Sequence, residues 1–559
     1  MARELKRATV RIVTNYARLF ITVMLGVTMV PIVLGGVGEI GFGLWSLLGA
    51  TIGLGDMFRE IVRSSMNREL GAAYHEPGRP RFPAVYNAAV VVAAMAALAA
   101  GAVYVALYWL VHLLNVEPDW IAAARWVIVA QGVYSVVVVT CAPQVNMHLV
   151  SERLIWHNLF RSMDRFSYFV GAIVVFWILK PPDPRTGLVW FVFTGSSLAV
   201  LFVLLSVANI ARLERGLAIR PSLVSWKEVR GVLATSGWNG AMSLALNLHI
   251  RLDQIIVNVF FGTVANAAFS VGVRLTAYIR MLAVGMTDGL DVVAARLSST
   301  EDHKTLDSVL RNSTRAHAYV ALPPCAVVLA LAEPLVHLWV GRHLEPESMS
   351  RAVLSSQILV LGFTARGISD GWVRFLYGAG YVRRYAPVIL AGGLLNPFLA
   401  VALIHALPGE WSFSGPAWSF TAIFLAFHAL ALPWVGARCL GVPTWHMFRP
   451  MLRPTVATAL ASILLMAMPH VLPPDSPTGL LVNVGAFGAT YLALTPFLVL
   501  RQHERRRAWS LLRRHLLRAA DPSEDKVDQE SAMIGPGAVE PPPSGHLRSF
   551  RNQRIVDRE

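Results

Sequence analysis

The sequence predicts an all-α membrane protein with about fourteen transmembrane helices. Of its 559 residues, 55% are hydrophobic and 15% are charged, whereas roughly a quarter are charged in an average soluble domain. The mean hydropathy is +0.53. About 20 apolar residues cross a bilayer core about 30 Å thick. We predict spans at residues 12–36, 41–57, 84–114, 121–149, 156–179, 187–210, 234–260, 265–294, 316–340, 352–378, 384–406, 414–437, 451–472 and 478–500.

Short links that contain glycine or proline, such as Gly35-Gly36 and Pro181-Pro182, make successive spans neighbours in a helix bundle. The long polar link divides twelve of the spans into two groups of six. We therefore predict an N-lobe at 1–210, a linker at 211–231, a C-lobe at 232–440 and two more spans within 441–500. A loose repeat, in which the region of Gly36 recurs near Gly262 at an offset of about 226 residues, supports this division.

Charge predicts the orientation in the membrane. The net charge is +15, and most cations fall in alternate links, while the opposite links hold few, mainly Lys180, Arg185, Arg342 and Arg351. By the positive-inside rule both termini are cytoplasmic, in a multi-pass protein of a bacterial-type cytoplasmic (inner) membrane. Nucleic acid is not an expected partner, because the cations do not gather on one soluble face.

The C-terminal region differs from the spans. Residues 501–520 form a basic amphipathic helical pattern, with Trp509, Leu512 and Leu516 on one face. Such a helix can bind the anionic inner leaflet of the membrane, although a solvated end of the last helix fits the same pattern. Residues 521–559 are predicted to be disordered, because they contain few large apolar side chains.

The sequence lacks the motifs of common catalytic sites. It contains no Walker A, HExxH or GxSxG pattern and no soluble insertion long enough for a catalytic domain. Cys141, Cys325 and Cys439 are widely separated, which excludes CxxC spacing. We expect no enzyme activity, no metal site and no cofactor.

Ionisable residues inside spans are the candidates for function, because a charge in mid-membrane is costly without a partner or a water-filled cavity. The first span contains Asn15 and Arg18, where the arginine faces either a cavity or the inner interface. Asp56 and Arg59 lie three residues apart at the end of the second span. A cavity role and a local ion pair are both open for this pair.

The seventh span contains His249, Arg251 and Asp253 within two helical turns. Because Arg251 and Asp253 are two residues apart, they point to different sides of the helix. One of them can therefore line a cavity while the other binds a neighbouring helix.

The eighth span adds Arg274 and Arg280, followed by Asp288 and Asp291. We expect Arg280 and the two aspartates to form a gate of ion pairs between the lobes.

The tenth span carries Arg366, Asp370 and Arg374 at successive i,i+4 positions, so all three project from one helix face. This predicts a ladder of cation, anion and cation. Its residual positive charge suits an anionic ligand, since arginine forms bidentate bonds to phosphate.

Two stretches carry a family resemblance. The first comprises Pro31–Gly36, Gly41–Leu48 and Gly53–Asp56. The second runs from Leu252–Ile256 through Ala265–Phe269 to Val273-Arg274. With the number of helices and the division into lobes, they resemble polysaccharide-repeat-unit flippases of the multidrug/oligosaccharidyl-lipid/polysaccharide exporter superfamily.

The resemblance implies two six-helix lobes around a central cationic cavity, plus two C-terminal helices. It implies alternating access that moves a polyprenyl-pyrophosphate-linked oligosaccharide from the inner to the outer leaflet for polysaccharide biosynthesis, with polysaccharide polymerase machinery as a partner. The resemblance and the span positions together predict two sets of site residues. The substrate-binding residues are Arg18, Asn15, Arg59, Arg251, Arg274, Arg366 and Arg374. The coupling or orienting residues are Asp56, Asp253 and Asp370. The coupling ion, H⁺ or Na⁺, stays open.

Two functions of the same superfamily are alternatives. A cation-coupled multidrug exporter should carry acidic residues deep in its early spans, whereas Arg18 is the one full charge inside the first span. A peptidoglycan lipid-precursor flippase shares nearly the same chemistry. A membrane-embedded polymerase or acyltransferase is disfavoured because the predicted outer links are short, and a scaffold would leave the buried arginines unexplained.

Overall fold

The computed structural model is all-α, which confirms the predicted fold class. It describes residues 2–214, 217–285, 290–299, 303–502, 504–506 and 510, without the side chains of 2–18, 52–65, 67–68, 234–248, 292, 299 and 303. No β-strand occurs in these parts of the chain. Within them, twelve helical stretches are long and apolar enough to cross a membrane. The protein is therefore a multi-pass membrane protein.

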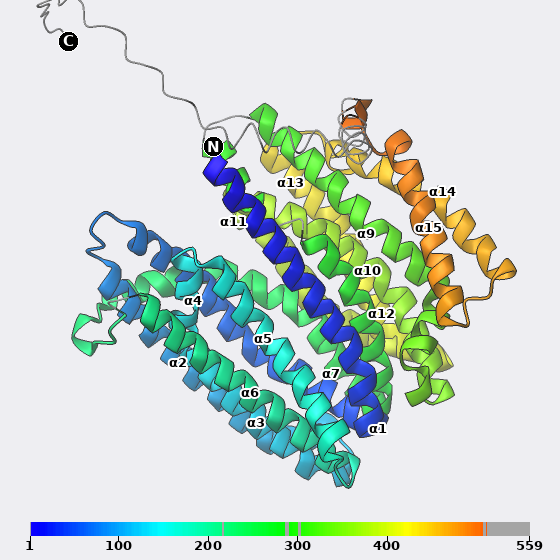
Figure 1. Cartoon of the computed structure of the whole chain (residues 1–559), viewed down its shortest axis with the longest axis horizontal. Helices are drawn as coiled ribbons and strands as arrows, with labels where there is room; N and C mark the ends of the chain where they lie inside the picture. The colour runs from blue at the N-terminus through cyan, green and yellow to red at the C-terminus, as the bar shows by residue number, and fades with distance from the viewer. Residues whose placement is uncertain are drawn as a thin grey trace, which may run out of the picture. The chain divides into compact units, whose positions relative to one another are not determined.

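The helices fall into an N-terminal half, a C-terminal half and a final pair (Figure 1). The N-terminal half comprises α1 (Ala2–His75), α2 (Phe82–Leu110), α3 (Ile121–Thr140), α4 (Ala142–Val150), α5 (Leu154–Ile173) with the π-helical extension Val174–Leu179, and α6 (Pro184–Leu213). The C-terminal half comprises α7 (Trp226–Val284), α8 (Leu290–Ser299), α9 (His303–Val340), α10 (Pro346–Gly378), α11 (Val382–Ala406), α12 (Gly415–Ile423), the π-helical segment Phe424–Ala431 and α13 (Leu432–Leu440). The final pair is α14 (Trp445–Val471) and α15 (Pro477–Leu498).

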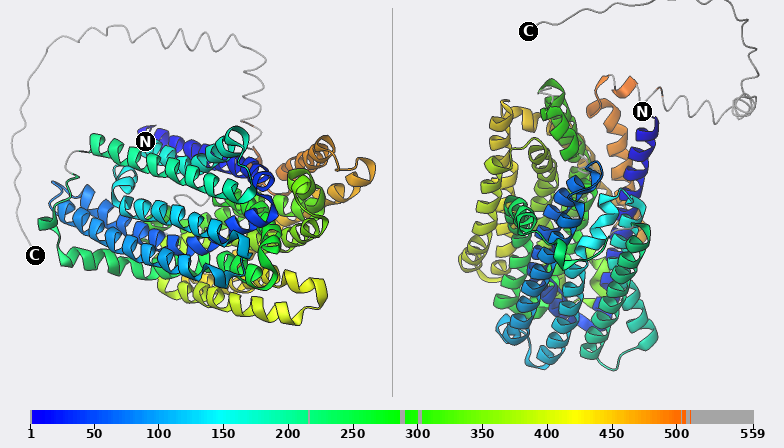
Figure 2. Two further views of the ribbon diagram at one scale, coloured as in Figure 1. Left: turned by 90° about the horizontal axis from the view of Figure 1, so that it is seen from below. Right: turned by 90° about the vertical axis from the view of Figure 1, so that its left-hand side faces the viewer.

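In both views of Figure 2, the blue-to-teal helices α2–α6 gather on one side and the yellow-green helices of the C-terminal half on the other. The final pair packs on α9, where the rings of Tyr319 and Tyr491 stack with centroids 5.2 Å apart. The Tyr491 hydroxyl also donates to the Tyr319 carbonyl at 3.1 Å. The final pair is thus attached to the C-terminal half through α9.

The twelve helical stretches accommodate the fourteen predicted spans, because α1 and α7 each contain two helices that meet at a glycine. The helices α1 and α7 each contain two of the predicted spans, joined at Gly38 (φ 70°, ψ −179°) and at Gly262 (φ 82°, ψ 179°). This backbone region is essentially restricted to glycine. Each helix is therefore a pair of helical arms. The two glycines lie 224 residues apart, close to the expected repeat offset, but the partner of Gly262 is Gly38 rather than Gly36.

The halves approach each other most closely where α1 meets α7. A Cβ atom on Gly43 would lie 1.8 Å from the carbonyl oxygen of Thr263 and 3.2 Å from the backbone nitrogen of Ala267. Ala267 follows Gly43 by the same 224 residues that separate the two kink glycines. The Asn266 amide donates to the Gly43 carbonyl at 3.1 Å. Only a residue without a side chain allows this backbone contact.

Hydrogen bonds join the halves near the kink glycines, a region that we call the Gly38 end. The Glu39 carboxylate accepts from the Ser348 hydroxyl and from the backbone N–H of Glu345. The Asn115 amide donates to the carbonyls of Asn258 and Val259 at 3.3 and 3.2 Å. The two halves are therefore held together at this end.

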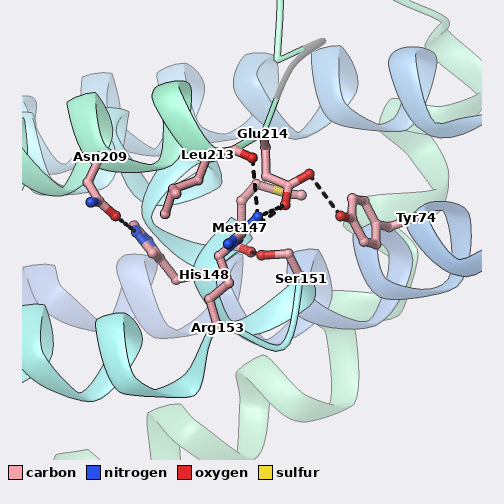
Figure 3. A network of polar contacts seen from close by, with 8 residues as sticks. All are labelled: Tyr74, Met147, His148, Ser151, Arg153, Asn209, Leu213 and Glu214. Carbon is pink, nitrogen blue, oxygen red and sulfur yellow. Dashed lines mark hydrogen bonds and ion pairs between the residues drawn. The ribbon is translucent and has the colours of Figure 1, made fainter.

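A second polar network lies within the N-terminal half, near the end of α1 (Figure 3). The Tyr74 hydroxyl donates to Glu214 Oε2 at 2.9 Å, and the Arg153 guanidinium donates to Glu214 Oε1 at 2.9 Å. Burial, followed by the contact with Glu214, raises the pKa of Tyr74. The network ties together the ends of α1 and α6 and the link before α5.

Candidate functional site

A cavity of about 540 Å³ lies between the two halves. Helices α1, α3 and α5 of the N-terminal half face α7 and α10 of the C-terminal half across it. It is lined by Met29, Trp45, Ser46, Leu48, Gly49, Ala50, Val127, Gln131, Tyr134, Asp164, Arg165, Tyr168, Ile250, Arg251, Gln254, Val273, Arg274, Ala277, Arg280 and Arg366.

The charges that line this cavity are mostly positive. Among the described lining residues are five arginines and one carboxylate, Asp164. Arg165, Arg274 and Arg366 form no ion pair within the described part of the chain. An uncompensated guanidinium is costly inside a membrane unless water or an anion solvates it. The cavity is therefore suited to an anion.

Two of these arginines extend from α7 to α1. Arg251 donates from Nη1 to the Gly49 carbonyl at 3.1 Å. Arg274 donates to the Ser46 hydroxyl at 3.4 Å, and its guanidinium carbon lies 4.4 Å from the centroid of the Trp45 ring. Both side chains thus bridge the halves at the cavity wall.

The charged ladder predicted for α10 does not form as expected. Asp370 accepts from Arg280 Nε of α7 at 2.7 Å, instead of pairing along its own helix. Arg366 is only 5% exposed, its Nε atom has no hydrogen-bond partner, and its guanidinium carbon lies 5.4 Å from the centroid of the Phe424 ring. Arg374 is half-buried one turn beyond Asp370 and does not line the cavity.

The predicted gate of ion pairs between the lobes is also wrong for Arg280. Its partner, Asp370, belongs to α10 of the same half, because the packing of α7 on α10 places the two side chains together. Asp291 begins α8 and Asp288 lies outside the described residues. The Arg280–Asp370 pair therefore holds the C-terminal half together.

The N-terminal wall carries a hydrogen-bonded cluster. The Gln131 amide donates to the Tyr168 hydroxyl at 2.7 Å and lies 3.5 Å from the Ser196 hydroxyl, which is 3.0 Å from that of Tyr168. The Tyr134 hydroxyl donates to Asp164 Oδ1. These contacts connect α3, α5 and α6, and they fix the polar side chains that face the cavity.

The position of the Tyr168 ring depends on a small residue in α6. A Cβ atom on Gly195 would lie 2.6 Å from Cδ1 of that ring. Glycine at this position leaves the space that the ring occupies, next to Ser196.

Asp253 lies away from the cavity. Its side chain is 1% exposed, and Oδ1 accepts from the Asn396 amide of α11 at 2.7 Å, while Oδ2 has no hydrogen-bond partner. The Ser419 hydroxyl donates to Asn396 Oδ1 at 3.0 Å. Asp253 thus contacts α11, whereas Arg251, two residues earlier, faces α1 and the cavity. The expectation that Asp253 orients a cavity arginine is not met by these contacts.

Four predicted site residues cannot be placed. The side chains of Asn15, Arg18, Asp56 and Arg59 lie outside the described part of the structure. The predicted helix at 501–520 is described only in part, and 521–559 not at all.

Sequence reasoning missed the polar residues of the N-terminal wall. Asp164 and Arg165 are adjacent charges inside the predicted span 156–179, so the criterion of intramembrane charge could have identified both. Gln131, Tyr134 and Tyr168 are ordinary residues for a membrane helix, and only the packing of α3, α5 and α6 identifies them.

The fold and the cavity define an all-helical multi-pass membrane protein whose halves enclose a cationic chamber. Residues 241–402 match the family model MatE. No curated relative matches the sequence significantly. Twenty-four chains of solved structures match the fold.

Three of these structures illustrate the likeness. The fold is similar to the lipid II flippase MurJ in an inward closed conformation, with a TM-score of 0.64 and 12% identity over 86% of this chain and 98% of that one. It is also similar to a multidrug resistance MATE family transporter of the MOP superfamily in the inward-facing conformation, with a TM-score of 0.61, 13% identity and 76% and 98% coverage. For the outward-facing conformation of a multidrug resistance MATE family transporter, the TM-score is 0.56 and the identity is 12%. That match covers 77% of this chain and 95% of the other. The chain therefore shares the fold of these transporters.

Proposed function

We propose that this protein is a flippase that moves the pyrophosphate and sugar head of a polyprenyl-linked oligosaccharide across the membrane, and that it is not an enzyme. The observation that carries the proposal is the cavity lined by five arginines and one carboxylate. Arg165, Arg274 and Arg366 provide positive charge with no ion-pair partner among the described residues. A pyrophosphate supplies the missing negative charge through charge-assisted hydrogen bonds.

The dimensions of the site support the same cargo. Its volume of about 540 Å³ falls within the range of roughly 300–1,000 Å³ for small-ligand sites. The polyprenyl chain is apolar and can stay in the lipid, so only the polar head needs the cavity. Arginines replace part of the hydration that the head loses on leaving water.

Alternating access would expose this cavity to each side in turn. The halves are joined at the Gly38 end by the contacts of Glu39 and Asn115. With both termini in the cytoplasm, as the loop charges predict, this end faces outward. The described conformation would then be closed on the outside, and separation of these contacts would release the cargo there.

Asp253 is our proposed coupling residue. A buried carboxylate with one unpartnered oxygen is unfavourable, and a proton or a sodium ion would offset that cost. The Asn396 amide donates to Oδ1 of Asp253, and the Asn396 side-chain oxygen accepts from Ser419. A proton on the unpartnered Oδ2 fits these contacts, and a proton gradient would then favour one conformation of the C-terminal half.

The superfamily alternatives differ in the charge that they require. A drug exporter for cationic amphiphiles would need negative charge in the cavity, but the one described lining carboxylate, Asp164, is engaged by Tyr134 and lies next to Arg165. A lipid II flippase carries the same pyrophosphate-linked class of cargo. The cavity charge therefore favours either glycolipid over a drug.

The test is mass spectrometry of the lipids that copurify with the full-length protein. We would compare wild type with Arg366→Gln, and use Arg185→Gln as a matched control, because Arg185 is exposed and pairs with Asp119 outside the cavity. Enrichment of an anionic polyprenyl glycolipid, lost in Arg366→Gln and kept in the control, supports the proposal and identifies the sugar. Absence of anionic glycolipid from wild type, with saturable binding of a cationic amphiphile, would overturn it.

A further inference from the structure

The two walls of the cavity differ in chemistry. The C-terminal wall presents Arg251, Arg274, Arg280 and Arg366. The N-terminal wall, formed by α3 and α5, presents one carboxylate next to one guanidinium, so its formal charge is zero. Its other polar groups are an amide and two phenols. A ligand with a charged part and a neutral, hydroxyl-rich part would meet a suitable surface on each side.

The side chains on the neutral wall are held in position before any ligand binds. Gln131, Tyr168 and Ser196 contact one another within 2.7 to 3.5 Å, and Tyr134 donates to Asp164. The supporting hydroxyl of Ser196 comes from α6, behind the wall. Such pre-organisation lowers the entropy lost on binding and is typical of a built recognition surface.

Sugar hydroxyls both donate and accept hydrogen bonds. A carboxylate only accepts, an amide does both, and a phenol does both while its ring also offers an apolar face. Gln131, Tyr134, Asp164 and Tyr168 supply each of these functions on one wall.

A phosphate would be a poor ligand for the same wall. Arg165 offsets the charge of Asp164 on this wall, whereas the four guanidiniums opposite, one of them paired with Asp370, give that side a net positive charge that attracts a phosphate. A cationic ligand is disfavoured because Arg165 lies next to Asp164.

We infer that the α3–α5 wall is a saccharide subsite, and that cargo is held with its first sugar against Gln131, Tyr134, Asp164 and Tyr168 and its pyrophosphate against the arginines of α7 and α10. This inference rests on the proposed function and adds to it the orientation of the cargo. Sugar discrimination then resides in the N-terminal half, while phosphate affinity resides in the C-terminal half.

The experiment measures binding of four probes to the purified full-length protein. The probes are farnesyl pyrophosphate, and farnesyl pyrophosphate that carries glucose, galactose or N-acetylglucosamine. The readout is the ratio of the Kd of the bare probe to that of each glycosylated probe. Variants are Gln131→Met and Tyr168→Phe, with Tyr491→Phe as a control, since its hydroxyl bonds to Tyr319 outside the cavity. Arg366→Gln tests the phosphate side.

We expect wild type to bind at least one glycosylated probe about tenfold more tightly than the bare one, as one or two hydrogen bonds would provide. Gln131→Met and Tyr168→Phe should lower that ratio about three- to tenfold while the Kd of the bare probe stays within about twofold. Arg366→Gln should weaken all probes together, and Tyr491→Phe should change nothing.

Equal binding of all four probes to wild type would overturn the saccharide subsite and leave the flippase proposal intact. So would a parallel loss of affinity for bare and glycosylated probes in both wall variants. If wild type binds no pyrophosphate, bare or glycosylated, the proposed function itself fails. The Tyr168→Phe variant keeps the ring and its packing. It therefore still tests the subsite if Gln131→Met does not fold.

Discussion

Arg280 of α7 donates its Nε hydrogen to Oδ2 of Asp370 of α10 at 2.7 Å, at the edge of the cavity. The side chains are 28% and 12% exposed. This pair neutralises one of the cavity arginines from outside the lining. Arg280 is therefore compensated by a carboxylate, whereas Arg165, Arg274 and Arg366 have no ion-pair partner among the described residues.

Asp370→Asn should destabilise the protein, because it leaves the Arg280 guanidinium without its carboxylate. Breaking a largely buried pair costs about 3 kcal/mol, visible as a lower Tm of the purified protein. The double variant Arg280→Gln with Asp370→Asn should recover part of the loss, since it removes the unpaired charge. A Tm for Asp370→Asn equal to wild type would show that the pair contributes no stability.

Alanine at Gly38 or Gly262 should be poorly tolerated. Both glycines adopt backbone angles that a Cβ atom disfavours, and the strain amounts to about 1–3 kcal/mol per site. Gly485→Ala is the matched control, because a Cβ there meets nothing within 4 Å and its φ is ordinary. Thermal unfolding in detergent should separate the two kink variants from the control.

Gly43→Ala should loosen the contact between the halves. Its Cβ would overlap the Thr263 carbonyl, whereas a Cβ at Gly49, in the same helix, meets nothing within 4 Å. The measurement is disulfide cross-linking between cysteines placed at Glu39 and Ser348, after replacement of Cys141, Cys325 and Cys439. Cross-link yield should fall in Gly43→Ala and not in Gly49→Ala. Equal yields would mean that the halves do not depend on this close approach.

Tyr74→Phe should remove a pH dependence at alkaline pH. The folded pKa of Tyr74 lies above the ordinary value of 10.0 because of burial and Glu214. A raised folded pKa gives stability that is complete below the unfolded pKa and is lost as the pH rises through the folded pKa. Wild type should therefore lose Tm above about pH 10 more steeply than Tyr74→Phe. If Tm falls equally with pH in wild type and Tyr74→Phe, other groups cause the loss of stability at alkaline pH.

The fold was largely predictable because hydropathy and length determine which segments can cross a bilayer. The paired arms of α1 and α7 appeared in the sequence as separate spans, since Gly38 and Gly262 interrupt the apolar runs. The angle at which the two arms meet at such a glycine depends on backbone angles that composition does not reveal.

The candidate site was predictable only in part. Intramembrane charge identified Arg251, Arg274 and Arg366, which line the cavity. The i,i+4 rule placed Asp370 in a ladder with Arg366 and Arg374 of the same helix. That rule takes no account of neighbouring helices, and the packing of α10 on α7 brings Asp370 to Arg280 instead. The orientation of Asp253 toward Asn396 likewise depends on which helix lies beside α7.

The contacts of Glu39 and Asn115 affect the equilibrium between the closed and open forms of the protein. They are hydrogen bonds in a region where water would enter once the halves part, so each broken bond is replaced by one to solvent. The net cost of such an exchange is about 0.5–1.5 kcal/mol per bond. The hydrogen bonds at the Gly38 end can therefore break and re-form reversibly, and they add only a small free-energy difference between the closed and open forms.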